Sequence, residues 1–360
     1  MTFARFMELA LYEREHGYYS TRADRGSRTG DFLTAPEIHP IFGWTLAVQA
    51  AEMWERAGRP AEFVLREYGA GSGALAEALL TGLQDRFPEV YKRVLYEPIE
   101  VLPARLATVA RRLEAAGHAD RVVSEPAGPA VGCVLANEFL DALPVHRVAL
   151  RDGRLVELLV DWRNGTFEEL AREPSSGKLT RRLADDEVQL GEGQEAEICL
   201  ELDGWVAEVS ARLIRGYVLV IDYGHPASEL YGARRMRGSL LAYRRHQLAD
   251  DPLAAGGEQD LTAHVDLTAL ERAAEREGLA VLGRTSQAEF IAGLGAGELL
   301  ASLGRHATTR PEDYLTARSA VARLLDPRLL GGFAVVVLGR GVPTEPPLRG
   351  LGFRMERPAP

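Results

Sequence analysis

A glycine-rich turn constrains the fold of this chain more than any other feature. Gly69, Gly71 and Gly73 follow the apolar run 63–65 and precede a helical pattern. Glycine at alternate positions lets the backbone bend tightly and approach a ligand, and the start of a helix offers N–H groups without internal partners. This order of strand, turn and helix predicts an α/β sheet that binds an adenosine-containing cofactor.

Two cofactors are compatible with this turn. Gly69, Gly71 and Ala74 satisfy the G-x-G-x-x-A pattern of dinucleotide sites. Glu67 stands two residues before the first glycine, where a carboxylate accepts a hydrogen bond from the ammonium of a methionine moiety but repels a pyrophosphate. Glu100 lies 31 residues after Gly69, later than the roughly 20 residues expected for the ribose acid of a dinucleotide site. The residues favour S-adenosyl-L-methionine, and NAD is the alternative.

Composition narrows the choice of partners. The chain has 42 Lys and Arg against 52 Asp and Glu, a net charge of −10, which argues against nucleic acid or an anionic membrane surface. A basic substrate is expected instead. Cys133 and Cys199 lie far apart in apolar runs, and the eight histidines show no ligand spacing, so we predict no disulfide and no metal.

The N-terminus reads as an amphipathic helix that carries Glu8, unlike a signal or transit peptide. No apolar run approaches the roughly 20 residues that cross a bilayer. These features predict a cytoplasmic protein without membrane insertion.

Local patterns predict three parts: an N-terminal helical segment with a lid loop at 1–60, a doubly wound, mostly parallel sheet at 61–144 and 202–340, and an inserted β-rich substrate region at 145–201. Hairpin signals at Asp152-Gly153 and Asn164-Gly165 predict antiparallel strands in the insertion. Helices are expected at 3–12, 41–56, 202–213, after Asp266, after Ser286 and near 312–325, and strands at 94–100, 131–136, 217–221 and 333–338.

Acidic residues follow two predicted strands of this sheet, where ligands bind in open α/β folds. Glu138 and Asp141 come after Asn137, and on a helical turn they would share one side and clamp a guanidinium. Capping of the next helix is the structural alternative, although Pro144 limits that helix to a turn. Asp222, in Asp222-Tyr223-Gly224, is either a site residue or part of a strand-end turn, and the sequence leaves its role open.

Further polar residues lie in two stretches that we predict to be irregular, 20–40 and roughly 223–264. Asp31 and Thr34, in a lid-like loop, are expected to contact the cofactor, or else to belong to a solvated turn. His264 either orients the substrate, serves as a base near neutral pH, or is structural. The sequence leaves the same choice between a site role and a structural role open for Tyr243 and His246.

Several motifs together resemble one family, the MidA-like class I S-adenosylmethionine-dependent methyltransferases, which includes the mitochondrial complex I assembly-factor arginine methyltransferase. The resemblance covers nearly the whole chain. The matching segments are Gly17-Tyr18-Tyr19, Gly30-Asp31-Phe32 with Thr34, the glycine turn, Asn137 to Pro144, Asp222-Tyr223-Gly224, Asp260 to Asp266, and Ser286-Gln287 with Phe290.

The resemblance implies a Rossmann-like class I methyltransferase core with an N-terminal helical segment, an inserted antiparallel β meander and extra helices. It implies Glu67, Gly69, Gly71, Gly73 and Glu100 as cofactor contacts, to which we add Asn137 as an expectation. The implied activity is methylation of a protein arginine, which in the mitochondrial member lies in the quinone-site subunit of respiratory NADH:quinone oxidoreductase, and we expect an equivalent subunit as the substrate here. From their position and spacing, we expect Glu138 and Asp141 to be the catalytic residues.

Two alternatives to this activity stay open. One is a non-catalytic assembly factor that keeps the methyltransferase fold, and the other is an NAD-dependent oxidoreductase. The sequence also leaves open whether the protein forms a homodimer.

Overall fold

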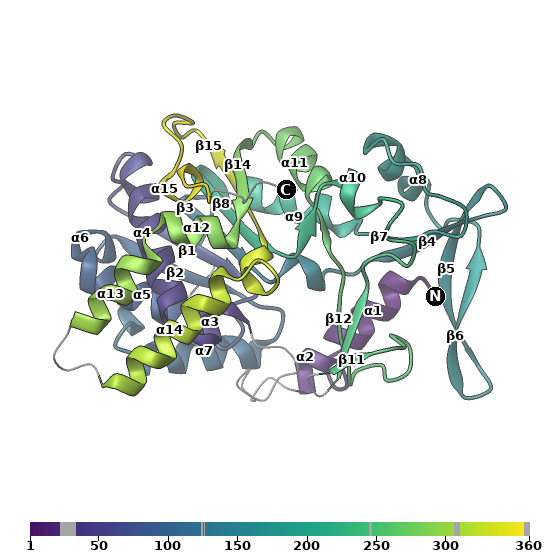
Figure 1. The fold of residues 1–360 in the computed structure, drawn as a ribbon, viewed down its shortest axis with the longest axis horizontal. Helices are drawn as coiled ribbons and strands as arrows, with labels where there is room; N and C mark the ends of the chain where they lie inside the picture. The colour runs from purple at the N-terminus through teal and green to yellow at the C-terminus, as the bar shows by residue number, and fades with distance from the viewer. Residues whose placement is uncertain (22–33, 124, 126, 245–246, 306–309, 356–360) are drawn as a thin grey trace. The chain divides into compact units, whose positions relative to one another are not determined.

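The computed structural model describes residues 1–21, 34–123, 125, 127–244, 247–305 and 310–355. The chain divides into two compact units (Figure 1). Unit 1 comprises Met1–Phe32, Glu138–Glu208 and Asp222–Glu277, and unit 2 comprises Leu33–Asn137, Val209–Ile221 and Gly278–Pro360. The chain therefore crosses between the units several times.

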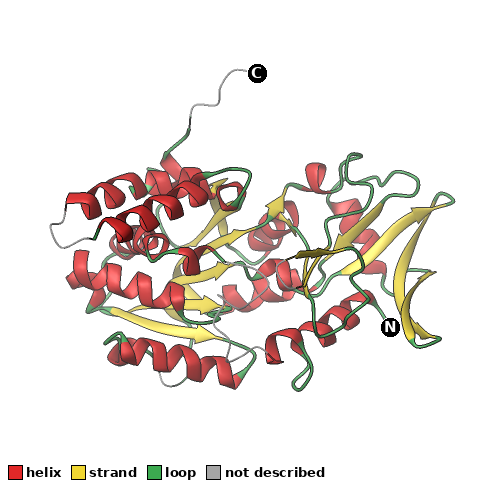
Figure 2. Cartoon of the chain, turned by 60° about the horizontal axis from the view of Figure 1, so that its bottom comes forward, coloured by secondary structure: helices red, strands yellow, loops and turns green. Residues whose placement is uncertain are grey.

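Unit 2 contains a six-stranded sheet in the order β14-β15-β8-β3-β1-β2. Strands of the protein lie among its helices in Figure 2. Strands β2, β1, β3 and β8 pair in parallel, and β14 pairs with β15 antiparallel. This confirms the predicted doubly wound, mostly parallel sheet. The strands are β1 (Phe63–Tyr68), β2 (Val94–Ile99), β3 (Ala130–Asn137), β8 (Leu213–Asp222), β14 (Ala280–Ser286) and β15 (Ala334–Arg340).

A buried ion pair lies inside this sheet. Arg66 of β1 donates from Nε to Oε2 of Glu97 at 2.7 Å, and its remaining N–H groups bond to three backbone carbonyls. Successive strand residues point to opposite faces, so Arg66 is directed away from the face that carries Glu67. A buried charge of this kind is tolerated because each guanidinium nitrogen donates to an acceptor and Glu97 balances the charge.

Helices of unit 2 pack on the sheet and on one another. Helix α4 lies so close to α5 that a Cβ on Gly43 would come within 2.5 Å of the Ala78 Cβ, which is why glycine stands there. The helices are α3 (Ala35–Ile38), α4 (Ile41–Arg56), α5 (Ala74–Arg86), α6 (Pro88–Tyr91), α7 (Pro103–Ala115), α12 (Gln287–Gly293), α13 (Ala296–Arg305), α14 (Pro311–Leu325) and α15 (Arg349–Gly352).

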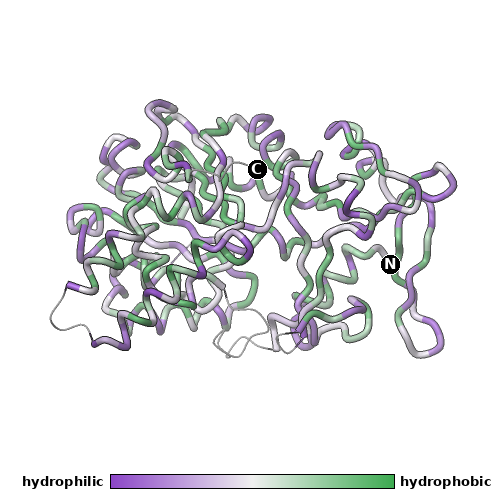
Figure 3. The backbone as a smooth tube through the Cα atoms, in the orientation of Figure 1, coloured by the Kyte–Doolittle hydropathy of each residue, from purple (hydrophilic) through white to green (hydrophobic). Residues whose placement is uncertain are grey.

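Unit 1 contains an antiparallel sheet in the order β6-β5-β4-β7. Its two predicted turns are confirmed, since Asp152-Gly153 and Asn164-Gly165 both have positive φ at both residues, as type I′ turns require. The β5–β6 turn is hydrophilic (Figure 3). The strands are β4 (His146–Arg151), β5 (Arg154–Arg163), β6 (Thr166–Arg172) and β7 (Glu195–Ile198).

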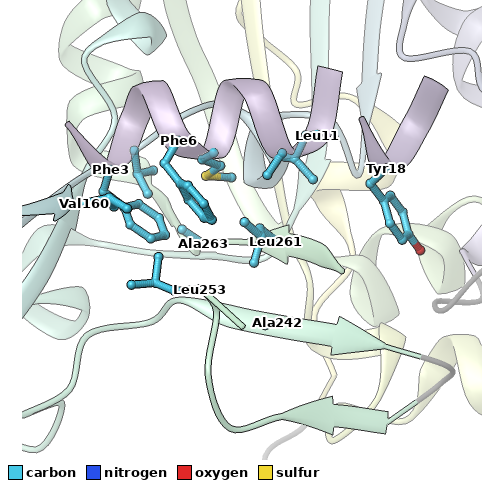
Figure 4. Close-up of a cluster of buried hydrophobic side chains, with 12 residues drawn as sticks. Phe3, Phe6, Leu11, Tyr18, Val160, Ala242, Leu253, Leu261 and Ala263 are labelled. Atoms are coloured by element: carbon cyan, nitrogen blue, oxygen red, sulfur yellow. The ribbon is translucent and has the colours of Figure 1, made fainter. Parts of the chain in front are cut away.

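Helix α1 (Phe3–Tyr12) forms where the sequence predicts it, and Thr2 caps it by accepting the Arg5 N–H. Its apolar face is buried in a hydrophobic cluster (Figure 4). Each large side chain buried in this way contributes about 2 kcal/mol. The cluster includes Phe3, Phe6, Met7, Leu11, Val160, Ala242, Leu253, Leu261 and Ala263.

Part of unit 1 differs from the sequence prediction. The stretch 223–264, predicted to be irregular, contains a three-stranded sheet, β11-β10-β12. Strands of three or four residues carry too little alternation to be recognised. The further elements are α2 (Tyr18–Thr21), α8 (Gly177–Asp185), α9 (Glu201–Ala211), β9 (Gly224–His225), α10 (Ala227–Leu230), β10 (Leu241–Arg244), β11 (Gln247–Ala249), β12 (Asp260–Thr262), β13 (Val265–Asp266) and α11 (Leu267–Arg276).

The two units also divide the chain differently from the three predicted segments. The predicted N-terminal segment 1–60 contributes to both units, and residues 222–277, which we assigned to the sheet core, belong to unit 1. The physical reason is the cluster around α1, in which Ala242, Leu253 and Leu261 pack beside residues from the start of the chain.

Candidate functional site

The glycine turn has the geometry that its sequence predicts. After β1, Gly69, Gly71 and Gly73 have φ of +70°, +56° and +75°, a region that disfavours residues with a Cβ. A Cβ on Gly71 would meet no protein atom closer than 3.8 Å, so the backbone conformation, rather than crowding, requires glycine. The turn leads into the N-terminus of α5, a helix of 13 residues. Unpaired N–H groups at such an end favour an anionic or polar ligand.

Glu67 is a buried carboxylate at the end of β1. Glu67 is 3% exposed, and its Oε2 accepts a hydrogen bond from the Tyr96 hydroxyl at 2.6 Å. Burial raises the pKa of Glu67 to about 7, the Tyr96 hydrogen bond opposes this, and the nearby Glu100 carboxylate adds to it. Among the described residues no cation pairs with Glu67. A ligand ammonium would supply the missing positive charge.

Glu100, directly after β2, holds the glycine turn. Its Oε1 accepts the Gly71 N–H at 2.6 Å. Burial raises the pKa of Glu100, whereas the positive charge of Arg105 and the N–H groups of Gly71 and Val101 lower it. The predicted pair of acidic residues, Glu67 and Glu100, therefore lies with the glycine turn in unit 2.

Thr34 and Asn137 also lie in unit 2. Thr34 occupies the N-cap position of α3 without a side-chain cap bond, and Glu37 of that helix accepts the Ser72 hydroxyl of the glycine turn at 2.6 Å. Asn137 is the last residue of β3 and pairs in register with Ile221. Asp31 lies outside the described residues.

The residues after β3 form a tight turn in unit 1. Glu138 has φ of +50°, a left-handed conformation that costs a non-glycine residue roughly 1–2 kcal/mol. A 3-10 turn, Leu140–Ala142, follows. The predicted helical turn therefore exists, but it contains Asp141 and begins after Glu138.

Asp222 organises this turn from the end of β8. Its Oδ2 accepts the N–H groups of Phe139, Leu140 and Asp141 at 3.1, 2.8 and 3.3 Å, and its Oδ1 accepts that of Tyr223 at 2.8 Å. Burial raises the pKa of Asp222 to about 7, and these four N–H donors oppose it by favouring the ionised form. The role that the sequence left open is thus structural: Asp222 holds the turn that carries Glu138 and Asp141.

Asp141 is buried among other acidic residues. It is 6% exposed, and burial raises its pKa well above the usual range, with further increases from Asp222, Glu138 and Asp260. No ion pair joins Asp141 to a cation in the described part of unit 1. A cation brought by a ligand would favour its ionised form.

Two residues that no sequence pattern marked as site residues, Asp260 and Tyr19, meet at this acidic cluster. Asp260 of β12 is buried, and its Oδ1 accepts the Tyr19 hydroxyl at 2.9 Å. Tyr243 stands opposite Asp260 in the antiparallel pair of β10 and β12. Their motifs were visible in the sequence, but nothing in the spacing indicated that residues 19 and 260 meet.

His264 is held close to the same turns. The neighbouring N–H groups of Ala263 and Val265 donate to the carbonyls of Asp141 and Tyr223 at 2.9 and 2.7 Å. The His264 ring stacks on Tyr223 and His225, with centroids 5.8 and 5.3 Å away. Burial, together with His225 and Arg235, lowers the pKa of His264 to about 4. A ring with so low a pKa is a weak base, which favours a packing role for His264. His246 lies outside the described residues.

The comparisons with known proteins identify the class of protein that this fold and these residues define. Residues 45–285 match a family described as "Putative S-adenosyl-L-methionine-dependent methyltransferase". The chain belongs to this family, and it is an S-adenosyl-L-methionine-dependent methyltransferase with a class I, Rossmann-like core. The predicted fold class, enzyme class and cofactor are confirmed.

Individual relatives cover most of the chain. It is 32% identical to the Drosophila melanogaster mitochondrial homolog of protein arginine methyltransferase NDUFAF7, over 91% of this chain and 78% of the relative. It is 28% identical to human mitochondrial NDUFAF7, over 82% and 70%. A crystal structure from Burkholderia thailandensis with S-adenosyl-homocysteine bound is similar with a TM-score of 0.86 and 33% identity, covering 97% of this chain and 90% of that one.

The predicted cytoplasmic location is contradicted, because the relatives from Drosophila melanogaster and human are named mitochondrial proteins. Charge and hydrophobicity describe the folded chain, whereas a compartment is set by targeting signals that these properties do not encode. None of the helices in the described residues has both the length and the hydrophobicity to span a bilayer. The described residues also hold no group of three or more His, Cys, Asp or Glu arranged as a metal site.

Proposed function

We propose that this methyltransferase methylates an arginine side chain of a protein. The observation that carries the proposal is the acidic cluster of unit 1, where Glu138, Asp141 and Asp260 gather and Asp141 lies buried without an ion-pair partner among the described residues. A guanidinium is a permanent cation with N–H donors on every nitrogen, which matches several carboxylates. The names of the relatives, protein arginine methyltransferases, agree with this substrate.

We assign the cofactor to the residues around the glycine turn. Bound S-adenosyl-L-methionine supplies an electrophilic methyl group. Glu67 would accept the hydrogen bonds of its ammonium, and Glu100 those of its ribose hydroxyls, while the backbone at Gly69, Gly71 and Gly73 would leave room for the cofactor. Asn137, Asp31 and Thr34 remain further proposed contacts.

Glu138 and Asp141 are the proposed catalytic residues. A guanidinium resists deprotonation, so its positive charge must be localised on two nitrogens for the third to present a lone pair to the methyl group. Carboxylates hydrogen-bonded to the first two nitrogens would do this. Asp222 supports them indirectly, since it fixes the backbone between residues 139 and 141.

For the substrate we propose a quinone-site subunit of respiratory NADH:quinone oxidoreductase, as the resemblance to the MidA-like family implies. We assign substrate binding to unit 1, which contains both the acidic cluster and the strands β4 to β7 of the predicted substrate region.

Methyl labelling in a cell extract tests this function. The protein is incubated with S-adenosyl-L-methionine carrying an isotopically labelled methyl group, and labelled proteins are identified by mass spectrometry. We expect label on one arginine of a respiratory subunit. Label on lysine, on a carboxyl group or on small molecules alone would refute arginine methylation, and partner binding without label would support the non-catalytic assembly factor.

The buried Glu67 predicts a pH dependence of cofactor binding. Only ionised Glu67 can pair with the ammonium, and its pKa in the free protein is about 7. Binding lowers that pKa, so affinity is lost as the pH falls through 7, by up to about tenfold per pH unit, and is constant above it. Calorimetric titration with S-adenosyl-homocysteine at a series of pH values measures this slope.

Two variants make the pH prediction specific. Glu67→Gln removes the titrating group and should flatten the profile. Tyr96→Phe removes the hydrogen bond that lowers the pKa of Glu67, so the midpoint should move to higher pH. A Glu67→Gln protein that retains the wild-type slope would assign the titration to another group.

A further inference from the structure

Asp260 lies at the start of β12, in a setting that a surface aspartate does not have. It is 8% exposed and stands opposite Tyr243 of β10. Residues directly opposite in an antiparallel pair share one face of the sheet, so the Tyr243 ring and the Asp260 carboxylate are neighbours. Burying a carboxylate costs free energy unless hydrogen bonds or a cation compensate it.

The hydroxyl of Tyr19 provides one such hydrogen bond. Tyr19 belongs to α2, near the start of the sequence, and its hydroxyl donates to Asp260 Oδ1 at a distance of 2.9 Å. The Tyr19 ring lies 5.5 Å from that of Tyr12 and 5.3 Å from that of Tyr18. Tyr19 is thereby held in place by its neighbours and fixes one oxygen of Asp260.

Separate contacts attach both Asp260 and Tyr19 to the turn that carries Asp141. The Tyr12 hydroxyl, beside Tyr19, donates to the Ala142 carbonyl at 2.8 Å. The Ala263 N–H, three residues after Asp260, donates to the Asp141 carbonyl at 2.9 Å. The negative charge of Asp260 also raises the pKa of the Asp141 carboxyl.

We propose that Asp260 is a further substrate-binding carboxylate of the acceptor site, that it binds the substrate guanidinium together with Asp141, and that Tyr19 is its positioning residue. The inference rests on the proposed function. Two carboxylates on different nitrogens of one planar cation would fix its orientation, and the rings of Tyr19 and Tyr243 provide faces on which a guanidinium can stack.

Binding of ethylguanidinium, with S-adenosyl-homocysteine present, tests the inference without requiring activity. Asp260→Asn should weaken ethylguanidinium binding about tenfold, the effect of losing one charge-assisted hydrogen bond, and leave the affinity for S-adenosyl-homocysteine unchanged within about twofold. Asp250→Asn, which removes the same charge from an exposed position, is the matched control and should have no effect.

Tyr19→Phe tests the positioning role. It should weaken ethylguanidinium binding about threefold in the wild type and add nothing in the Asp260→Asn background, because its hydroxyl acts through Asp260. Tyr18→Phe, the same change one residue earlier, should have no such coupling. With the labelled protein as substrate, Asp260→Asn should raise KM more than it lowers kcat.

The outcomes separate the inference from the proposed function. Unchanged ethylguanidinium binding in Asp260→Asn, equal loss in Asp250→Asn, additive losses in the double variant, or no saturable binding by the wild type would each overturn the inference. Should Asp260→Asn fail to fold by circular dichroism, the comparison of Tyr19→Phe with Tyr18→Phe decides. Binding that depends on Asp260 without any arginine label in extract would refute the proposed function alone.

Discussion

Gly71→Val is expected to reduce affinity for S-adenosyl-homocysteine by more than about 100-fold, as a β-branched side chain at a left-handed position both strains the turn and occupies space that the ligand needs. Gly71 has φ of +56°, and its N–H donates a hydrogen bond to the Glu100 carboxylate. Displacing this backbone would therefore disturb the acidic residue at the end of β2 as well. Calorimetric titration measures the loss, and methyl transfer should fall with it.

A second glycine separates ligand binding from backbone strain. Gly117 has φ of +81°, and a Cβ there would meet nothing within 4 Å. Gly117→Val should therefore cost about the same stability, roughly 1–2 kcal/mol, while leaving cofactor affinity unchanged. If both variants lose affinity equally, the loss reports strain in unit 2, and the assignment of the cofactor to the glycine turn is wrong.

The double variant Glu138→Gln with Asp141→Asn is expected to lower the rate of arginine methylation by about 10³-fold, the effect of removing preorganised charge from a site where the acceptor must be polarised. S-adenosyl-homocysteine should still bind with wild-type affinity, because Glu67 and Glu100 are untouched. The rate is measured by single-turnover methylation of the substrate protein that the labelling experiment in cell extract identifies.

The loss of activity in this double variant should not be accompanied by a loss of stability. Replacing the Asp141 carboxyl, buried beside Asp222 and Asp260, by an amide removes a group whose ionised form is disfavoured, so Tm should be unchanged or higher. Asp152→Asn with Glu168→Gln changes the net charge equally at exposed positions and serves as the control. Full activity in the Glu138 and Asp141 variant would show that neither carboxylate acts in the reaction.

Local sequence signals predicted much of the fold. Each depends on residues close together in the chain: the glycines of the turn, the type I′ turn at Asn164-Gly165, and the caps in which Asp266 accepts the Ala269 N–H and Ser286 that of Glu289. The alternation of strands and helices between residues 61 and 142 likewise indicated the parallel sheet. These features were predictable because backbone conformation and capping are decided within a few residues.

The sequence alone determined the sheet, its glycine turn and the acidic residues that follow its strands. Only the tertiary structure decided how those acidic residues are held. Asp222 bonds to backbone N–H groups 81 to 83 residues earlier, and Tyr19 reaches Asp260 across 241 residues. The same holds for the pKa of Glu67, which depends on the burial of its side chain in the folded unit 2. Such contacts are set by how distant segments pack together, and no local pattern of residues encodes that packing.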